Sequence, residues 1–408
     1  MTIRWITPLL GTAPAEQIRS FLDVQIIDVR NLVDKAGNRP DAVTEKILEG
    51  VKSLERGRKT VVCCDHGVSR SNAIAAGILA IHDKTTLDAA IRKVQRATGE
   101  TEIKPEPLDA VRNAIESKVA NRKPAGKRTA LVTGARGFVG TATCRRLEEE
   151  FTVISLPRDQ LDVEQGSTLL GLLVAEHNVD CIIHLANPRI FTSNAALGKT
   201  LTMLRNVLEV CVSRDISLIY PSGWEIYSGY PGTLLADESV PAFPRGPYGE
   251  TKYLAELLIE HWQRSTRIQC AILRSSPVYG LGARKPKFIF NFIEKARRAE
   301  PIVTHRFLNG DPALDLLHID DFVDALVRVF RQKYVGTLNI GTGIATTTRD
   351  IAEMLKAEIG GTSRIEHTLI DAHTASIAMN YQKASTALGW APKVLLRDGL
   401  RSIVAGHI

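Results

Sequence analysis

Residues 129–140, with the sequence TALVTGARGFVG, determine the fold expected for most of the chain. Small and apolar residues at the start of this stretch predict a buried strand, and the segment TATCRRLEEE that follows predicts a helix. Between them, Gly134 permits a tight turn, Gly137 lets the backbone approach a phosphate, and Gly140 lets helix and strand pack closely. Free N–H groups at the start of such a helix favour anions. The pattern therefore predicts a loop that binds the pyrophosphate of a dinucleotide; an ordinary strand–helix turn is the alternative.

The spacing G-x-x-G-x-x-G resembles that of the short-chain dehydrogenase/reductase superfamily. The resemblance implies an α/β fold for residues 129–408, with a Rossmann-type, doubly wound parallel sheet and a smaller C-terminal substrate-binding region. It also implies NAD(P) as the cofactor. The loop residues that it places beside the cofactor are Gly134, Gly137, Phe138, Val139 and Gly140.

The strand predicted at residues 151–156 bears on the choice between NAD and NADP. It ends in Pro157 and Arg158, whereas NAD-binding proteins often place an acidic residue there to accept ribose hydroxyls. An arginine suits the 2′-phosphate of NADP, so the sequence favours NADP over NAD; a solvated surface arginine is the alternative. The resemblance implies further cofactor contacts at Asp162, Val163, Leu185 and Ala186.

Two later segments, SLIYPSGWEIYSG at residues 217–229 and YGETK at residues 248–252, narrow the resemblance. They resemble the extended short-chain dehydrogenases that epimerise, dehydrate or reduce nucleotide sugars. A spacing of four residues places Tyr248 and Lys252 on one face of a helix. In the family pattern the ammonium of Lys252 favours the phenolate of Tyr248 and binds the nicotinamide ribose. Tyr248 then exchanges a proton with a sugar hydroxyl or carbonyl, so both residues are expected to be catalytic and to contact the cofactor.

The third catalytic position departs from the pattern of that family. The alignment of residues 226 and 227 with the family's Val-Tyr pair puts Gly223 where a Ser or Thr normally hydrogen-bonds the reacting oxygen. Ser222 can substitute only if the strand end is bulged. Glu225 falls where the dehydratase and decarboxylase branches keep a glutamate for proton transfer; a surface acid is the alternative reading of this residue.

A second motif, the C-x5-R segment from Cys64 to Arg70, lies between a predicted strand at residues 59–64 and a predicted helix. A loop in this position turns successive backbone N–H groups inward at the positive end of a helix. These donors and Arg70 stabilise the Cys64 thiolate, and Arg70 can hold two phosphate oxygens in a bidentate fork. Ser71 can donate to the sulfur. The segment therefore predicts a phosphate-binding loop.

These residues resemble the protein-tyrosine and dual-specificity phosphatases over about residues 1–120. The resemblance implies that Cys64 is the nucleophile, Arg70 the phosphate clamp and Asp34 the general acid, with Asp28 and Asp41 as poorer candidates. Asp41 is also the cap expected for a helix at residues 41–55. Cys63 stands where the family usually has His, and two adjacent cysteines permit redox regulation.

Composition limits the classes of partner. Four basic and no acidic residues lie in a predicted linker at residues 121–128, which holds much of the net charge of +7, so the charge does not indicate nucleic-acid binding. No apolar run approaches the roughly 18 residues of a membrane span, and the first residues lack the layout of a secretory signal, so a cytoplasmic protein is expected. The six cysteines lack metal-ligand spacing, and no metal site is expected.

The sequence thus predicts a bifunctional cytoplasmic enzyme with a phosphatase-like domain at residues 1–120, a linker at 121–128 and an extended short-chain dehydrogenase at 129–408. Its expected substrates are small anions: a nucleotide-activated or phosphorylated sugar at one site and a phosphate ester at the other. A homodimer through the Rossmann domain is a further expectation. One alternative is a regulatory protein whose Rossmann half senses NADP(H) and whose phosphatase half is the output. Another is a phosphate-binding scaffold with neither half active.

Overall fold

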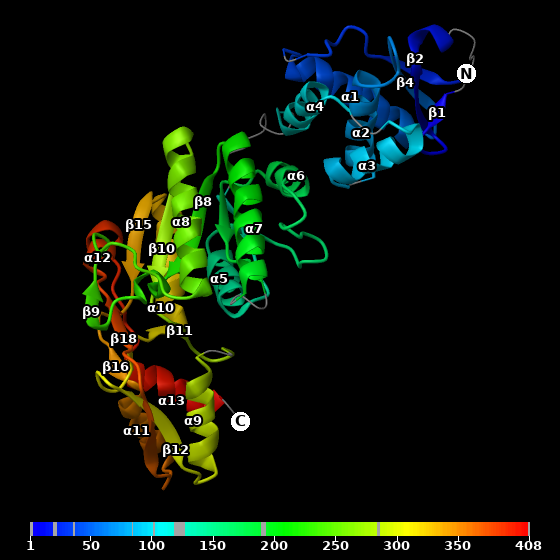
Figure 1. Ribbon diagram of the computed structural model, residues 1–408. Helices are drawn as coiled ribbons and strands as arrows, with labels where there is room; N and C mark the ends of the chain where they lie inside the picture. The colour runs from blue at the N-terminus through cyan, green and yellow to red at the C-terminus, as the bar shows by residue number, and fades with distance from the viewer. Residues whose placement is uncertain are drawn as a thin grey trace. The chain divides into compact units, whose positions relative to one another are not determined.

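The structure, a computed structural model, describes residues 3–18, 23–35, 37–83, 85–100, 103–117, 127–188, 193–283 and 286–406 (Figure 1). It contains two compact units, one of residues 1–126 with 165–178 and the other of residues 127–164 with 179–408. Most of the predicted basic linker, residues 121–126, lies outside the described residues. Within the part of the chain that is described, every helix is too short or too polar to cross a membrane.

The first unit is built on a four-stranded sheet in the order β1-β2-β4-β3. Its strands are β1 (Arg4–Trp5), β2 (Leu10–Pro14), β3 (Gln25–Asp28) and β4 (Thr60–Cys64). β1 is antiparallel to β2, whereas β2 and β3 both run parallel to β4. All five residues of β4 are buried. Burial on both faces explains why its sequence, TVVCC, is apolar or small throughout instead of alternating.

The helices of the first unit are α1 (Pro40–Glu55), α2 (Arg70–His82), α3 (Leu87–Thr98), α4 (Pro105–Ser117) and α6 (Thr168–Glu176). Every residue of α2 from position 71 to position 80 is buried, as expected for a helix that is apolar or small on all sides. The helix predicted at residues 41–55 begins one residue earlier, with Arg39 at its N-cap. The expectation that Asp41 caps this helix is therefore wrong.

The second unit contains a six-stranded parallel sheet in the order β15-β10-β8-β7-β5-β6. Its strands are β5 (Thr129–Thr133), β6 (Thr152–Ser155), β7 (Cys181–His184), β8 (Ser217–Gly223), β10 (Cys270–Ser275) and β15 (Gly336–Ile340). The chain moves outward from β5 to β6, then crosses back to β7 on the other side of β5. This reversal makes the carboxyl ends of β5 and β7 the topological switch point, where ligands bind in open α/β sheets.

Helices cover both faces of this sheet, which confirms the α/β Rossmann-type fold predicted for the second unit. α5 (Phe138–Glu148) and α10 (Ile319–Gln332) pack together on one face, with Leu147 and Phe322 in a common core with β5 and β10. α7 (Asn194–Ser213) and α8 (Pro247–Ser265) pack side by side against β7, β8 and β10 (Figure 1). α8 begins one residue before Tyr248, so Tyr248 and Lys252 lie in its first two turns.

The C-terminal region adds short strand pairs and a second helical layer. The pairs are β9 (Gly232–Ala236) with β18 (Ala375–Met379), β11 (Val278–Tyr279) with β14 (Leu317–His318), β12 (Ile302–Phe307) with β17 (Ile365–Ile370), and β13 (Ala313–Leu314) with β16 (Thr346–Thr347). The helices are α9 (Lys287–Arg297), α11 (Thr348–Ile359), α12 (Gln382–Leu388) and α13 (Leu396–Gly406). α9, α11 and α13 share an apolar core that includes Ile293, Ile351 and Leu400.

Candidate active site

The loop between β5 and α5 contains two positions, 134 and 140, at which only glycine fits the backbone. Gly134 has a φ of +69°, and a Cβ there would lie 2.7 Å from the backbone nitrogen of Ala186. A Cβ on Gly140 would lie 2.3 Å from the carbonyl oxygen of Gly134. Because side-chain carbons do not approach backbone atoms so closely, the two glycines allow the loop, α5 and the segment after β7 to meet.

Thr133 and His184 tie the ends of β5 and β7 together. Nδ1 of His184 lies 2.8 Å from Oγ1 of Thr133, and the N–H of Ala186 donates to the same oxygen at 3.2 Å. His184 is fully buried, and burial lowers its pKa to about 3. Its ring is therefore neutral near pH 7, as expected for a hydrogen-bonded core histidine.

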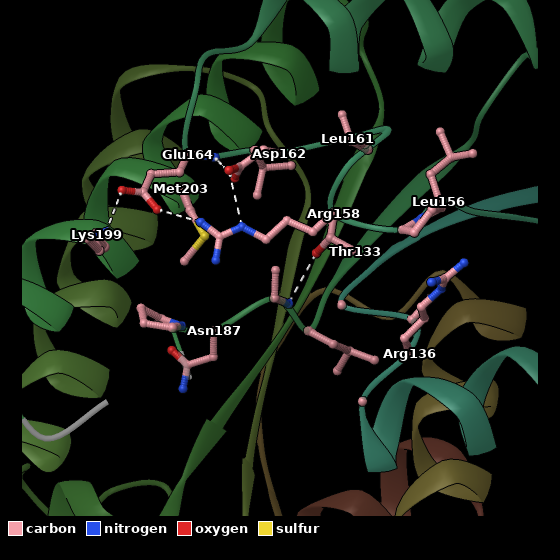
Figure 2. A pocket seen from close by; sticks show the side chains of 18 of the residues that line it. Thr133, Arg136, Leu156, Arg158, Leu161, Asp162, Glu164, Asn187, Lys199 and Met203 are labelled. Carbon is pink, nitrogen blue, oxygen red and sulfur yellow. Dashed lines mark hydrogen bonds and ion pairs between the residues drawn. The ribbon is translucent and has the colours of Figure 1, made fainter. Parts of the chain in front are cut away.

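Two cavities adjoin the glycine loop. The larger, of about 1040 Å³, extends toward the segment after β6 and toward α7 (Figure 2). The smaller, of about 560 Å³, lies at the ends of β8 and β10 and the start of α8. Gly134, Gly137 and the segment 185–188 line both. The residues predicted to bind the cofactor all line one or both cavities: Gly134, Gly137, Phe138, Val139, Gly140, Arg158, Asp162, Val163, Leu185, Ala186, Tyr248 and Lys252.

This arrangement fits a dinucleotide. The two crowded glycines form a narrow backbone turn before α5, where helix N–H groups favour a pyrophosphate. The larger cavity offers room for one nucleoside, and the smaller cavity receives Tyr248 and Lys252. Among the described residues, no group of His, Cys, Asp and Glu side chains has the arrangement of a metal site.

Arg158 reaches across the larger cavity to two carboxylates (Figure 2). Its Nε lies 3.1 Å from Oδ2 of Asp162, and its Nη2 lies 3.0 Å from Oε2 of Glu164. The Nζ of Lys199, on α7, lies 3.2 Å from the other oxygen of Glu164. Asp162 also accepts a hydrogen bond from the N–H of Glu164. Asp162, a predicted cofactor contact, is thus engaged with Arg158, the residue predicted to bind the 2′-phosphate.

Tyr248 and Lys252 lie next to each other, as the spacing predicts. Nζ of Lys252 lies 5.7 Å from the ring centroid of Tyr248 and donates to the carbonyl oxygen of Pro221 at 2.8 Å. It also lies 3.5 Å from the hydroxyl of Tyr220. β8 therefore supplies the oxygen atoms that hold the lysine in place.

The end of β8 shows what surrounds Gly223. β8 pairs with β10 in unbroken register up to Gly223 opposite Ser275. The condition for Ser222 to take the third catalytic position, a bulged strand end, is therefore not met. Its hydroxyl is buried and has no hydrogen-bond partner among the described residues. Glu225 follows in a single 3-10 turn, η2 (Trp224–Tyr227), and lines the smaller cavity with Tyr248 and Lys252.

Comparison with known proteins places this site in a family. Residues 130–341 match the model of the NAD dependent epimerase/dehydratase family, and the match spans more than half of the chain. The chain belongs to this family.

The alignments with individual relatives cover nearly the whole length of those relatives. A Methanocaldococcus jannaschii protein, to which UDP-glucose 4-epimerase activity is provisionally ascribed, is 29% identical over 301 residues, which cover 67% of this chain and 96% of the relative. The UDP-glucose 4-epimerase of Thermus thermophilus, solved with NAD, has a TM-score of 0.60 and 21% identity and covers 68% of this chain and 98% of its own. The RMD protein of Pseudomonas aeruginosa, solved with NADPH, has a TM-score of 0.60 and 22% identity over the same shares. At these identities the two structures show the common fold.

Within the family site, burial opposes the charged forms of both predicted catalytic residues. Burial raises the pKa of Tyr248 well above its ordinary value, and the negative charge of Glu225 adds to this increase. Burial lowers the pKa of Lys252 to about 8, against the opposing attraction of Glu225 and Glu256. Glu225 therefore influences the protonation of both neighbours.

Glu164 and Lys199 line the larger cavity but belong to no motif recognised in the sequence, whereas Tyr220 and Pro221 lie in the quoted segment 217–229 without a predicted role. Glu164 and Lys199 complete the charge network around Arg158, although they come from the segment after β6 and from α7. Tyr220 and Pro221 contact Lys252 from β8. Only their positions in the folded sheet bring them to the cavities.

The first unit places the C-x5-R segment at the end of β4, in the following loop and at the start of α2. Sγ of Cys64 lies 3.4 Å from Oγ of Ser71, within hydrogen-bond distance. Gly67 has a φ of +65°, and a Cβ there would lie 2.5 Å from the backbone of Ala13, so glycine lets the loop lie against β2. The structure thus brings Cys64 and Ser71 together.

Arg70 is held by neighbouring backbone and by one carboxylate. Its Nη1 donates to the carbonyl oxygen of Leu32 at 2.7 Å, and its Nη2 lies 2.5 Å from Oδ2 of Asp65. The guanidinium of Arg70 is therefore engaged at both of its terminal nitrogens in this structure.

Asp34, the predicted general acid, pairs with Lys104. Burial opposes its ionisation, but the hydrogen bond from Lys104 and the positive charges of Lys104 and Arg70 outweigh that effect and lower its pKa. Asp34 therefore carries a negative charge near pH 7 in this structure, whereas a general acid must hold a proton.

Cys63 and Cys64 point to opposite faces of the sheet. Cys63 packs with Ala13 and Val61, whereas Cys64 packs with Val62 and the main core of the unit. Burial also raises the pKa of the Cys63 thiol to about 11, so that it stays protonated. Because adjacent side chains on a strand point apart, the two thiols do not face each other, and the redox regulation that two adjacent cysteines permit stays a prediction.

Proposed function

We propose that the chain is an NAD(P)-dependent enzyme that epimerises, dehydrates or reduces a nucleotide-activated sugar. The observation that carries this proposal is the position of Tyr248, Lys252 and Glu225 around one cavity that adjoins the glycine loop. Family membership supports the same reaction class. The names of relatives that act on UDP-glucose favour a nucleotide sugar over a simple sugar phosphate.

In this proposal the cofactor is held by the glycine loop, by Leu185 and Ala186, and by the start of α8. When bound, the dinucleotide supplies two-electron oxidation and reduction of the sugar. Tyr248 exchanges a proton with the reacting sugar oxygen. Lys252 holds its positive charge beside Tyr248 and offsets negative charge that develops there.

The proposal is tested by incubation of the purified chain with NAD or NADP and a panel of nucleotide sugars that begins with UDP-glucose, followed by chromatography of the sugar products. We expect conversion of at least one sugar. Tyr248→Phe should lower turnover by about 10²–10⁴-fold, the usual value of one acid/base group, and should leave dinucleotide binding unchanged. Wild-type protein that binds a dinucleotide but converts none of the sugars would contradict the proposal and favour the regulatory alternative, in which this half senses NADP(H).

We also propose that the cofactor is NADP in preference to NAD. Arg158 supports this preference because its side chain is exposed to solvent at the far end of the larger cavity. The 2′-phosphate would compete with Asp162 and Glu164 for its guanidinium, and charge-assisted bonds of this kind are the stronger ones.

A second function, hydrolysis of a phosphate ester, is proposed for the first unit. The observation that favours it is the contact of Cys64 with Ser71 inside a strand–loop–helix turn that starts α2 with Arg70. Such a loop concentrates N–H donors on an anion and on a cysteine thiolate. For Asp34 to act as general acid, substrate binding must displace it from Lys104.

Hydrolysis of a generic aryl phosphate tests this second function. Cys64→Ser should abolish hydrolysis and retain binding of a phosphate analogue such as vanadate, because the loop N–H groups and Arg70 are intact. Cys63→Ser is the matched control, since Cys63 lies on the opposite face of β4. Equal hydrolysis by wild type and Cys64→Ser would exclude Cys64 as the nucleophile.

A further inference from the structure

The charged side chains beside the larger cavity form one connected series of ion pairs (Figure 2). The guanidinium of Arg158 contacts Asp162 and Glu164, and the ammonium of Lys199 contacts Glu164 from α7. All four residues line the cavity. The segment after β6 is thereby joined to α7 by ion pairs at the place where the proposed site would hold the adenosine half of the cofactor.

Glu164 has two cationic partners, one for each carboxylate oxygen. Its Oε2 lies 3.0 Å from Nη2 of Arg158, and its Oε1 lies 3.2 Å from Nζ of Lys199. The side chain of Glu164 is 20% exposed, whereas those of Arg158 and Lys199 are 66% and 51% exposed. The carboxylate is therefore more enclosed than either cation, and it costs more free energy to leave without a partner.

Asp162 also has a second partner that does not depend on Arg158. Its Oδ1 accepts a hydrogen bond from the backbone N–H of Glu164 at 3.1 Å, while its Oδ2 lies 3.1 Å from Nε of Arg158. Arg158 can therefore leave both carboxylates without depriving either of its last partner. For Glu164 this depends on Lys199, the other cation within ion-pair distance of it among the described residues.

A phosphate that binds Arg158 changes the balance of charge at this cavity. On the proposed site, the 2′-phosphate of NADP competes with Asp162 and Glu164 for the guanidinium. Without Lys199, release of Arg158 would leave the carboxylate of Glu164 unpaired beside the incoming anion, and like charges at short range repel. NAD has no phosphate at this position and leaves Arg158 in its ion pairs. Loss of Lys199 should therefore weaken NADP binding more than NAD binding.

We propose that Lys199 is a positioning residue for NADP selectivity, which holds the carboxylate of Glu164 when Arg158 binds the 2′-phosphate. The inference rests on the proposed 2′-phosphate site at Arg158 and extends it, because selectivity then belongs to Lys199, Glu164 and Arg158 together. Lys199 does not contact the cofactor phosphate in this proposal. Its effect on binding therefore requires the carboxylate of Glu164, which distinguishes it from a second phosphate-binding cation.

Titration of the purified chain with NADP and with NAD tests the inference without any turnover. We expect Lys199→Met to weaken NADP binding by about two- to five-fold, the range of one exposed ion pair, and to leave NAD binding nearly unchanged. Lys199→Arg keeps the charge and should retain the wild-type ratio of the two dissociation constants. Arg205→Met is the matched control, since it removes an exposed cation of the same helix that pairs with Glu209, and it should leave that ratio unchanged.

A double-mutant cycle with Glu164→Gln locates the effect. Glu164→Gln alone should strengthen NADP binding by a similar factor, because it removes an anion that competes for Arg158. In that background Lys199→Met should have no further effect on NADP, since a neutral amide needs no cation. The effect of Lys199→Met in the wild-type background should also shrink near 1 M salt, where the Debye length is about 3 Å.

Three results would overturn the inference. The first is equal weakening of NADP and NAD by Lys199→Met, and the second is no weakening of NADP at all. The third is an effect of Lys199→Met that persists together with Glu164→Gln, because Lys199 would then act on the phosphate directly. Melting temperatures of the variants show whether the fold is intact in each titration.

The titrations also separate this inference from the function on which it rests. If wild type binds neither dinucleotide, the proposed function and the inference both fail. If the variants show the expected pattern but wild type converts no nucleotide sugar, the role of Lys199 stands and the proposed activity fails. If wild type converts a sugar but Lys199→Met leaves the ratio of the two dissociation constants unchanged, only the inference fails.

Discussion

Arg158 shows how the neighbours of a single residue set its availability to a ligand. The guanidinium is shared between Asp162 and Glu164, and Lys199 shares Glu164. Its side chain is 66% exposed, so these ion pairs are in water and each is worth little. A 2′-phosphate with two negative charges can therefore compete for Arg158 more easily than a buried pair would allow.

Arg158→Ala should weaken NADP binding by about 1.5–3 kcal/mol, the value of a hydrogen bond to a charged group, and should leave NAD binding nearly unchanged. Titration of each dinucleotide by tryptophan fluorescence or calorimetry measures the difference. Arg205→Ala is the matched control, since Arg205 is an exposed arginine of α7 that pairs with Glu209. Equal losses for NAD and NADP would leave Arg158 without a part in cofactor choice.

Deprotonation of Lys252 should lower the activity of the enzyme at alkaline pH. Burial lowers its pKa to about 8, so the ammonium is complete below that pH and is lost as pH rises through it. If the positive charge is needed, kcat/KM should fall on the alkaline side with a midpoint near that value. Lys252→Arg keeps the charge at higher pH and should move this limb upward.

Loss of the folded state would not explain such a fall of kcat/KM at alkaline pH. A lysine with a lowered pKa in the folded state destabilises that state while it is charged, so its unfavourable contribution shrinks as pH rises from about 8 toward the ordinary value of 10.5. A melting temperature that holds across the limb would assign the loss to the site. An alkaline limb that is unchanged in Lys252→Arg would contradict the prediction.

At the scale of elements, the contact between η2 and α8 decides the geometry of the site. Gly249 is buried, and a Cβ there would lie 2.6 Å from the carbonyl oxygen of Glu225. On the far side of Lys252, Glu256 of α8 pairs with Arg274 of β10, which also donates to the hydroxyl of Tyr227 at 2.7 Å. The helix is therefore fixed to η2 at its first turn and to the sheet farther along.

Gly249→Ala should destabilise the fold by about 1–3 kcal/mol, as overpacking of a tight contact does, and should lower turnover because α8 moves away from Glu225. Gly198→Ala is the matched control: Gly198 is a helical glycine of α7 whose Cβ would meet nothing within 4 Å. It should stabilise by up to about 1 kcal/mol. Urea midpoints with an unchanged m-value measure both effects, and equal shifts would contradict the packing argument.

At the scale of the whole molecule, the two proposed activities belong to residues of different compact units. Cys64, Ser71 and Arg70 lie in the first, and Tyr248 and Lys252 lie in the second. Each loop uses the same physical device, a strand that ends in a turn before a helix, where N–H groups favour an anion. The homodimer and the cytoplasmic location expected from the sequence stay predictions.

The two activities should therefore be separable by substitution. Cys64→Ser should abolish hydrolysis of an aryl phosphate and spare conversion of a nucleotide sugar, whereas Tyr248→Phe should do the reverse. Parallel assays of both variants measure this. Loss of both activities in either variant, with the fold intact by circular dichroism, would contradict independent sites.

The Rossmann-type fold, the glycine turn and the pairing of Tyr248 with Lys252 could all be predicted from the amino-acid sequence. These are local properties: a buried strand, a positive φ at Gly134 and a spacing of four on a helix depend on residues close in the chain. The same local logic indicated the turn that brings Cys64 to Ser71.

The surroundings of these groups could not be predicted, because they depend on contacts between distant parts of the chain. Lys199 reaches Glu164 from α7, and Glu225 reaches the space beside Gly223 because η2 packs on Gly249. Cys63 and Cys64 are neighbours in sequence, yet the pleat of β4 sends them to opposite faces. Charge pairing and burial depend on residues far apart in the chain. The partners of Arg158 and the protonation of Lys252 therefore follow from packing and not from any motif. The same holds for the group that fills the space beside Gly223.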